Sequence, residues 1–337
     1  MPEILGENAD RLTTVEMRMK GMPRGYVHLL HEAARKHHQR PLGLLAAERL
    51  RGAISPGDRV VFTTGAHDRL WLHQGETDGP PGVAALAFTL AKGLAAVPIL
   101  VSEEPNLGPI LATTEAAGLS VMDFELARKR RMAAASCAFP TADEQGRRAA
   151  EEILDQYQPT AVVCCEKLGV NTKGVCHSVR GVCMEDGASL HHLVNGARQR
   201  SVLTISLADG GNEIGFGAIS EAVRDIMPYG RKCQCPCGAG NADTTVVDAL
   251  VIGAASNWAA YNVCACLAFL FENPKLLHSP ETEWRMLDAC VRAGAADAIL
   301  ASRELSVDGM PVEVHTSLIT MLHTLVENAL REVNRAY

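Results

Sequence analysis

The sequence has few aromatic residues and no excess of basic charge. Phe, Trp and Tyr make up 4% of the 337 residues, and 32 Lys and Arg residues stand against 39 Asp and Glu residues, for a formal net charge of −7. Nucleic-acid-binding domains normally cluster basic residues and have a pI above about 9, and single-strand binders stack bases on aromatic side chains. We therefore expect no nucleic-acid partner.

The first residues, MPEILGENADRL, lack the basic and apolar regions of a secretory signal peptide. The chain holds 11 cysteines, an odd number in a long sequence. Disulfide scaffolds belong mainly to small secreted proteins, whereas cytosolic cysteines stay reduced. We expect reduced thiols and a cytoplasmic location.

One segment, Thr244–Phe271, is apolar and long enough to span a bilayer. Asp248, Asn257 and Asn262 interrupt it, however. A buried strand followed by a buried helix explains the same residues without polar groups in lipid. We therefore expect no membrane association.

Short β-branched runs alternate with longer stretches rich in Ala and Leu, which indicates alternating strands and helices. The runs predict strands at Asp58–Thr63, Val97–Ser102, Leu119–Phe124, Thr160–Cys165, Ser201–Leu207 and Thr245–Gly253. Continuous apolar strands alternating with helices favour a parallel sheet covered on both faces. We predict a Rossmann-like, three-layer α/β fold with extra helices at both ends. It forms a single domain over residues 1–337, with a helical extension at residues 1–55.

Ligands of such sheets bind beyond the carboxyl ends of the strands, so the segments after the strands are the candidate site. Glu76 and Asp78 follow the first strand in a glycine-flanked segment, Gly75–Gly82. Glycine permits close approach of the backbone to a ligand. Capping of the following helix explains the same acidic residues, and both roles are compatible.

The most distinctive motif follows the fifth predicted strand and reads DGGNEIGFG, from Asp209 to Gly217. Its spacing is not that of a dinucleotide-binding loop, and Asp209 and Glu213 would repel a pyrophosphate. Carboxylates and an amide in a glycine-rich loop suit a hard divalent cation, Mn²⁺ or Mg²⁺. A tight turn in which Asp209 caps a helix is the structural alternative.

We expect four acids, Glu76, Asp78, Asp209 and Glu213, to converge if their strands are neighbours. A bound cation would offset their repulsion, which otherwise raises at least one carboxyl pKa. Without a metal, the same acids could form a general acid–base pair. Glu166, paired with Lys167 after the fourth strand, reads equally well as a site residue or as part of a surface ion pair. Asn257 reads equally well as a substrate-orienting amide or as the N-cap of the long apolar helix that begins there.

Four blocks of sequence together resemble the carboxyl-terminal domain of D-glutamate cyclase. They are GETDGPPG at Gly75, EKLGVNTKG at Glu166, DGGNEIGFG at Asp209 and SNW at Ser256. The resemblance implies a lyase that interconverts D-glutamate and 5-oxo-D-proline plus water, with a dependence on metal. It also implies a small acidic substrate, and it leaves open whether the chain forms a homo-oligomer.

The resemblance, together with the pattern of acids, assigns provisional roles to the residues. Asp209 and Glu213, with Asp78 or Glu76, would hold the metal. Glu166 or a remaining carboxylate would move protons, and Asn212 and Asn257 would orient the substrate. A metal-dependent hydrolase of phosphate esters, using the same carboxylates, is the main alternative. A non-enzymatic module that binds a small anion is a third.

The cysteines divide into two groups. Cys164, Cys165, Cys264, Cys266 and Cys290 lie in apolar segments and are predicted to be small core residues. Cys233, Cys235 and Cys237 form a CxCxC run, whereas a zinc half-site is usually CxxC with a matching second half. Zinc binding and redox chemistry remain alternatives for this run, and reduced thiols without a further role are the favoured interpretation.

Overall fold

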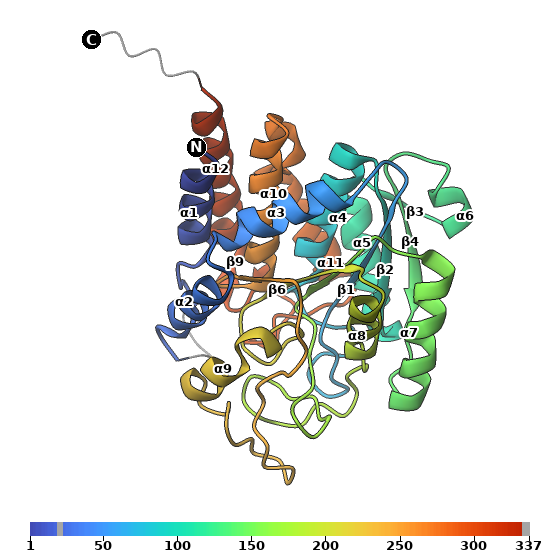
Figure 1. Cartoon of the computed structure of the whole chain (residues 1–337), viewed down its shortest axis with the longest axis vertical. Coiled ribbons are helices and arrows are strands. Elements are labelled where there is room, and N and C mark those ends of the chain that lie inside the picture. The colour runs from blue at the N-terminus through green and yellow to red at the C-terminus, as the bar shows by residue number, and fades with distance from the viewer. Residues whose placement is uncertain (19–22, 332–337) are drawn as a thin grey trace.

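The computed structural model describes residues 1–18 and 23–331 (Figure 1). Its centre is a sheet of seven strands in the order β3-β4-β2-β1-β5-β6-β7, and each strand runs parallel to its neighbours. The strands are β1 (Arg59–Thr64), β2 (Val97–Ser102), β3 (Ser120–Val121), β4 (Ala133–Ala138), β5 (Ala161–Cys165), β6 (Leu203–Ala208) and β7 (Ala249–Ile252). A separate antiparallel hairpin joins β8 (Ser306–Val307) to β9 (Met310–Pro311).

The central strands are buried on both faces, which explains why their sequences are continuous apolar runs and do not alternate. Val61 in β1, for example, pairs with Ile99 in β2 on one side and with Val162 in β5 on the other. All three side chains are fully buried.

Helices cover both faces of this sheet (Figure 1). On one face lie α4 (Pro80–Leu94), α5 (Glu104–Ala116) and α10 (Ser256–Leu270), where α4 packs against both α5 and α10. On the other lie α7 (Asp143–Tyr157) and α8 (His191–Gln199), which pack against each other. The predicted three-layer, Rossmann-like α/β fold is therefore confirmed.

The extra helices at both ends, also predicted, add a further layer. They are α1 (Pro2–Thr13), α2 (Tyr26–His38), α3 (Leu42–Ala53), α11 (Pro280–Arg292) and α12 (Val312–Leu330). Helix α1 packs against both α10 and α12, so the two ends of the fold lie side by side (Figure 1). The remaining short helices are α6 (Phe124–Ala127), α9 (Ser220–Ile226), η1 (Gly217–Ile219) and η2 (Pro274–Leu276).

The apolar segment Thr244–Phe271 forms strand β7 and helix α10, as predicted. In the part of the chain that the structure describes, no helix is long and apolar enough to cross a membrane. The polar residue Asn262 of α10 is fully buried and donates a hydrogen bond of 2.8 Å to the carboxylate of Asp10 in α1. That carboxylate also accepts from the backbone amide of Leu42, at 2.8 Å. Asn262 therefore joins α10 to the amino-terminal helices.

Two strand predictions differ from the structure. Strand β4 has the sequence AAASCA and was not predicted, because alanine has low strand propensity and gives no β-branched signal. The strand expected at Leu119–Phe124 pairs with β4 only at Ser120 and Val121. The chain then turns at Asp123 into α6, so this strand is a short edge of the sheet.

The strand order changes direction between β1 and β5. On one side of β1 lie β2, β4 and β3, with β3 coming before β4 in the sequence, and the chain then returns to β5 and builds the other way through β6 and β7. Ligands of open α/β sheets bind at such a switch point, beyond the carboxyl ends of the strands. Here the switch point is flanked by the segments that follow β1 and β5.

Candidate functional site

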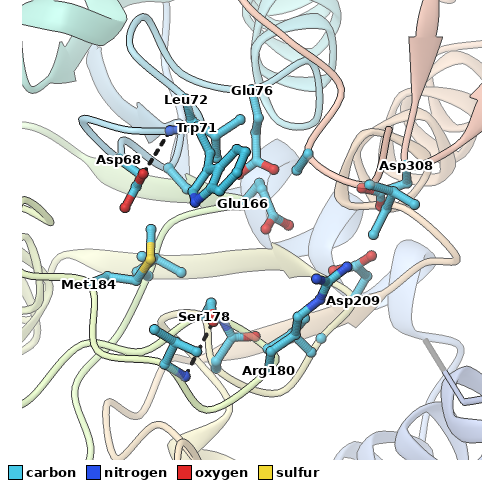
Figure 2. A pocket seen from close by; sticks show the side chains of 18 of the residues that line it. Asp68, Trp71, Leu72, Glu76, Glu166, Ser178, Arg180, Met184, Asp209 and Asp308 are labelled. Atoms are coloured by element: carbon cyan, nitrogen blue, oxygen red, sulfur yellow. Dashed lines mark hydrogen bonds between the residues drawn. The ribbon is translucent and has the colours of Figure 1, made fainter. Parts of the chain in front are cut away.

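A cavity of about 420 Å³ lies beyond the carboxyl ends of β1, β5 and β6. Four residues predicted from the sequence line it, namely Glu76, Glu166, Asp209 and Asn212. Figure 2 shows the carboxylates of Glu76, Glu166, Asp209 and Asp308 gathered around this space. The expected convergence of the loops after β1 and β6 is thus observed, with the loop after β5 between them.

The loop after β1, which carries Glu76, is held in place by hydrogen bonds to the carboxyl-terminal part of the chain. The amide of Thr77 donates to the carbonyl of Ala296 at 3.0 Å, and its hydroxyl donates to the carbonyl of Ser306 at 2.8 Å. Glu76 is buried, and its Oε1 has no hydrogen-bond partner among the described residues. Burial, with further contributions from Asp308 and Asp78, raises the pKa of Glu76 well above its usual range.

Asp78 does not line the cavity and lies just beneath it, at the start of α10. Its two carboxylate oxygens accept hydrogen bonds of 2.8 Å from the backbone amides of Ser256 and Asn257. The predicted capping role is therefore present, but the helix that Asp78 caps is α10 and not α4, the helix that follows it. Burial raises the pKa of Asp78 to about 8, and Asp308 adds to the shift.

Asn257 is fully buried and is not among the residues that line the cavity. Its Oδ1 accepts from the amides of Gly79 at 2.9 Å and Gly82 at 2.7 Å, and its Nδ2 donates to the carbonyl of Thr77 at 3.1 Å. The side chain thus holds the start of α4. No contact of Asn257 with the cavity supports the substrate-orienting role. The alternative, an N-cap of the long apolar helix α10, is also wrong, because the N-cap of α10 is Ala255 and the Asn257 side chain caps α4.

Glu166 follows β5 directly and points into the cavity. Its backbone adopts φ +47°, a left-handed conformation that turns the chain sharply away from the strand. Its Oε2 accepts a hydrogen bond of 2.5 Å from the hydroxyl of Ser256. Burial raises the pKa of Glu166 well above its usual range, and the nearby Glu213 and Glu76 carboxyls raise it further.

Lys167 does not form the surface ion pair considered from the sequence. Its ammonium group lies in the interior and donates to the two carboxylate oxygens of Glu103 at 2.6 and 2.5 Å and to the carbonyl of Gly65 at 2.7 Å. Both side chains of this ion pair are 1% exposed. The pair therefore ties the loops after β1, β2 and β5 together beneath the site.

The DGGNEIGFG motif forms a loop whose backbone amides donate hydrogen bonds to the carboxylate of its own residue Glu213. Glu213 Oε1 accepts from the amides of Asp209 at 3.1 Å and Gly210 at 2.7 Å, whereas Oε2 has no hydrogen-bond partner in the described parts of the chain. Burial raises the pKa of Glu213. Asn212 lines the cavity, and its Nδ2 donates to the carbonyl of His177 at 3.0 Å.

Two further charged residues of the site were not predicted. Arg18 precedes α2, and its guanidinium contacts the carboxylate of Asp209 and pairs with that of Asp308 at 2.8 Å. Asp308 lies in the turn between β8 and β9, and burial raises its pKa despite the opposing charge of Arg18. Arg18 also donates to the hydroxyl of Tyr26 at 2.8 Å. Nothing in the spacing of either residue marks it in the sequence.

The donor set fits a hard divalent cation. Oxygen atoms of Asp78, Glu166 and Asp209 lie within 4.8 Å of one another. Glu76 and Glu213 each add a buried oxygen without a partner in the part of the chain described here. Carboxylate oxygens are the ligands that Mg²⁺ and Mn²⁺ prefer. The compact group contains Glu166 and omits Glu76 and Glu213, so it overlaps the four predicted ligands only in Asp78 and Asp209.

Comparison with known proteins bears on the identity of this site. No curated protein matches the chain. The family model described as "D-glutamate cyclase-like, C-terminal" matches residues 23–323. This range includes all seven strands of the sheet and all four sequence blocks that carry the resemblance. Because the match spans nearly the whole sequence, the chain belongs to the D-glutamate cyclase-like family.

Proposed function

We propose that this chain is a metal-dependent lyase that interconverts D-glutamate and 5-oxo-D-proline plus water. The observation that supports it most is the group of buried carboxylates around a single cavity at the switch point of the sheet. The family membership supports a cyclase-type reaction. The cavity volume of about 420 Å³ falls within the range of about 300–1,000 Å³ that is typical of small-molecule sites.

The reaction sets the requirements for the site. The amino nitrogen of D-glutamate must lose two protons and form a bond to the side-chain carboxyl carbon. One carbon–oxygen bond of that carboxyl group breaks, and the oxygen leaves as water with the two protons. The site must therefore hold the substrate folded, increase the electrophilicity of one carboxyl group and transfer protons over a short distance.

In this proposal, Asp78, Glu166 and Asp209 hold the divalent cation. The bound ion would supply Lewis-acid polarisation of the substrate carboxyl group. Asp78 keeps its capping bonds in this arrangement, because each carboxylate oxygen has more than one lone pair. Arg18 balances part of the remaining charge through Asp209 and Asp308.

Glu76 is our candidate for proton transfer. It lines the cavity, its Oε1 has no partner among the described residues, and burial raises its pKa well above the usual range, which favours the protonated form. The protonated carboxyl group can deliver its proton to the leaving oxygen, and the resulting carboxylate can take up a proton from the amine. Asn212 and Arg180, on the opposite wall, would orient the substrate carboxylates.

The test is turnover of D-glutamate and of 5-oxo-D-proline, followed by chiral chromatography. Protein stripped with a chelator is compared with protein given Mn²⁺ or Mg²⁺, and L-glutamate serves as the stereochemical control. We expect turnover only with metal. Glu76→Gln should lower kcat by about 10²-fold or more, the usual size of a general acid–base contribution.

Glu104→Gln is the matched control, because Glu104 is exposed at the start of α5, outside the site. Wild-type turnover that is insensitive to metal, or a Glu76→Gln variant as active as this control, would refute the assigned roles. If D-glutamate is inert and phosphate is released from p-nitrophenyl phosphate, the hydrolase alternative replaces the cyclase.

A further inference from the structure

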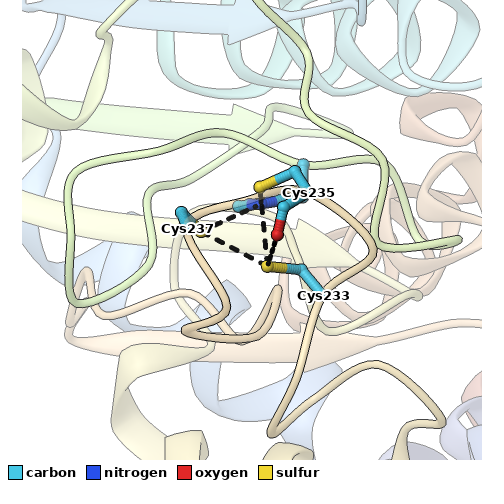
Figure 3. A group of neighbouring side chains, drawn as sticks. Cys233, Cys235 and Cys237 are labelled. Carbon is cyan, nitrogen blue, oxygen red and sulfur yellow. Dashed lines mark hydrogen bonds between the residues drawn. The ribbon is translucent and has the colours of Figure 1, made fainter.

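A second group of ligand-type side chains lies apart from the carboxylates. Three cysteines come from the loop at residues 231–241, the cysteine loop, and one histidine comes from residues 171–184, the histidine loop. Figure 3 shows the thiols of Cys233, Cys235 and Cys237 facing one another. With Nε2 of His177, the three sulfur atoms form a set of four donors that all lie within 4.8 Å of one another.

The distances within this set match tetrahedral coordination. Cys233 Sγ lies 3.6 Å from Cys235 Sγ and 3.3 Å from Cys237 Sγ. His177 Nε2 lies 3.1 Å from Cys235 Sγ and 3.6 Å from Cys237 Sγ. Thiolates bound to zinc at about 2.3 Å stand about 3.8 Å apart in a tetrahedron. The four donors therefore need to move outward by only a few tenths of an ångström to surround one ion.

The histidine is oriented as a metal ligand. Its Nδ1 lies 3.0 Å from the carbonyl of Val175, so this nitrogen carries the ring proton and donates it. The lone pair of Nε2 consequently faces the thiols. In zinc-bound histidines the other ring N–H is usually donated to a backbone carbonyl or a carboxylate, which fixes the tautomer in this way.

The surroundings favour a charged thiolate centre. Asn171 Nδ2 donates to Cys237 Sγ at 3.4 Å and to the carbonyl of Gly240 at 2.7 Å, and Lys173 Nζ donates to the carbonyl of Cys237 at 2.8 Å. Three thiolates and a neutral histidine around Zn²⁺ carry one net negative charge, which these donors offset. The cysteine loop reaches this shape through Gly240, at φ +79°, where a Cβ atom would stand 2.0 Å from the carbonyl oxygen of Gly230.

From this geometry we propose that Cys233, Cys235, Cys237 and His177 form a structural zinc site. All four positions are filled by protein ligands, which is typical of structural zinc and leaves no coordination position for a substrate. The unusual CxCxC spacing is accommodated because a turn between Cys235 and Gly238 brings the third sulfur back to the first two.

The site would fix one wall of the cavity. Ser178, Val179 and Arg180 line the cavity and directly follow His177. The cysteine loop binds their backbone, since Asn241 Nδ2 donates to the carbonyl of Val179 at 3.1 Å and Gln234 Nε2 donates to that of Arg180 at 2.7 Å. A zinc ion would hold the two loops together at this interface.

The experiment uses the full chain, purified under reducing conditions. We expect one zinc per chain by elemental analysis. Replacement of zinc by Co²⁺ should give the intense thiolate-to-cobalt charge-transfer absorption of a tetrahedral thiolate site. The carboxylate site cannot produce this band, because it has no sulfur ligand. The test is therefore independent of whether the proposed cyclase activity is found.

Variants test whether these four residues produce the thiolate-to-cobalt band. Cys235→Ser and His177→Asn should weaken or shift it, whereas Cys183→Ser should leave it unchanged, because Cys183 is a neighbouring half-buried cysteine outside the set of four. Zinc removal should also accelerate tryptic cleavage at Lys173, Arg180, Arg231 and Lys232, all of which are exposed, and added zinc should reverse this.

Three results would overturn the proposal. The first is wild-type protein that retains no zinc and shows no thiolate band with Co²⁺. The second is a band that survives unchanged in both ligand variants. The third is a disulfide among the three cysteines in protein from which no metal has been removed. The first and third depend on wild-type protein alone, so they decide the question even if a variant fails to fold.

Discussion

Asp78 and Asn257 cap each other's helices. Asp78 precedes α4 and caps α10, whereas Asn257 lies in α10 and caps α4. The carboxylate of Asp78, just before α4, accepts the first amides of α10, and the side-chain amide of Asn257, in the first turn of α10, accepts two amides at the start of α4. The two loops after β1 and β7 are thereby fixed to each other. Asp78 is held where its carboxylate can also serve the site above it.

This reciprocal capping predicts a large effect of Asn257→Ala. The substitution leaves the buried amide of Gly82 without an acceptor and leaves the amide of Gly79 with only its 3.0 Å bond to Asp78, and an unsatisfied buried group costs about 1–3 kcal/mol. We expect the free energy of unfolding to fall by about 2 kcal/mol or more, measured by urea denaturation. Asn195→Ala is the control, because Asn195 is exposed on α8. Equal effects of the two substitutions would contradict the capping role.

The raised pKa of Asp78 predicts that the metal-free protein loses stability as pH rises. The pKa is about 8 in the folded chain and about 3.9 in the unfolded chain, so the folded state binds more protons between these values. The free energy of unfolding then decreases from about pH 4 to about pH 8. Glu166 and Glu76, whose pKa values are also raised, add to the same trend.

Divalent metal should reverse this dependence, because a cation binds the deprotonated carboxylates and so stabilises the folded state more at higher pH. The measurement is the melting temperature across this pH range, with a chelator and with Mn²⁺. A melting temperature that rises with pH in the chelated protein, through the range in which Asp78 titrates, would argue against the shifted pKa.

Arg18 contacts Asp209, so it should compete for this carboxylate with the metal that we propose. Unit charges about 4 Å apart interact by about 4 kcal/mol at an effective dielectric constant of about 20. Arg18→Met should therefore increase Mn²⁺ affinity by about tenfold or more, measured by calorimetry, since a tenfold change needs only about 1.4 kcal/mol. It should also lower the melting temperature of the metal-free protein. Arg11→Met, at an exposed position in α1, is the control. Unchanged affinity would show that the guanidinium and the metal do not compete.

The buried pair of Lys167 and Glu103 predicts a strong loss of stability when one partner is removed. Lys167→Met leaves a carboxylate that is 1% exposed without its cation, which typically costs about 3–5 kcal/mol. Arg200→Met breaks a more exposed pair with Asp155 and should cost less than about 1 kcal/mol. Chemical denaturation of the two variants gives the comparison, and similar losses would refute the structural role of the buried pair.

The sequence predicted the fold through its strands, because β-branched runs report burial on both faces of a sheet. Strand β4 was not predicted, because no local sequence pattern marks it. Its alanines are buried only through the position of the strand between β2 and β3. The carboxylates after β1, β5 and β6 were predictable, because the carboxyl ends of neighbouring parallel strands meet at one edge.

The rest of the site depends on contacts between distant segments. Arg18 and Asp308 come from outside the strand–helix units, so no rule about strand ends points to them. The position of Asn257 at the start of an apolar helix suggested a cap of that helix, α10, whereas the structure shows that its side chain caps α4, a helix distant in sequence. His177 was not linked to the cysteines because the two loops are far apart in sequence and meet only in the folded chain.

The charged groups around the cavity come from six separate stretches of the chain, represented by Arg18, Glu76, Glu166, Arg180, Asp209 and Asp308. They span Arg18 to Asp308, so no short fragment contains them all, and the acids repel one another unless Arg18 or a metal is present. Metal affinity is therefore a readout of the complete tertiary structure. A proteolytic cut that separates Asp78 from Glu166 and Asp209 should abolish it, and mixing the two complementary fragments should restore it if they reassociate.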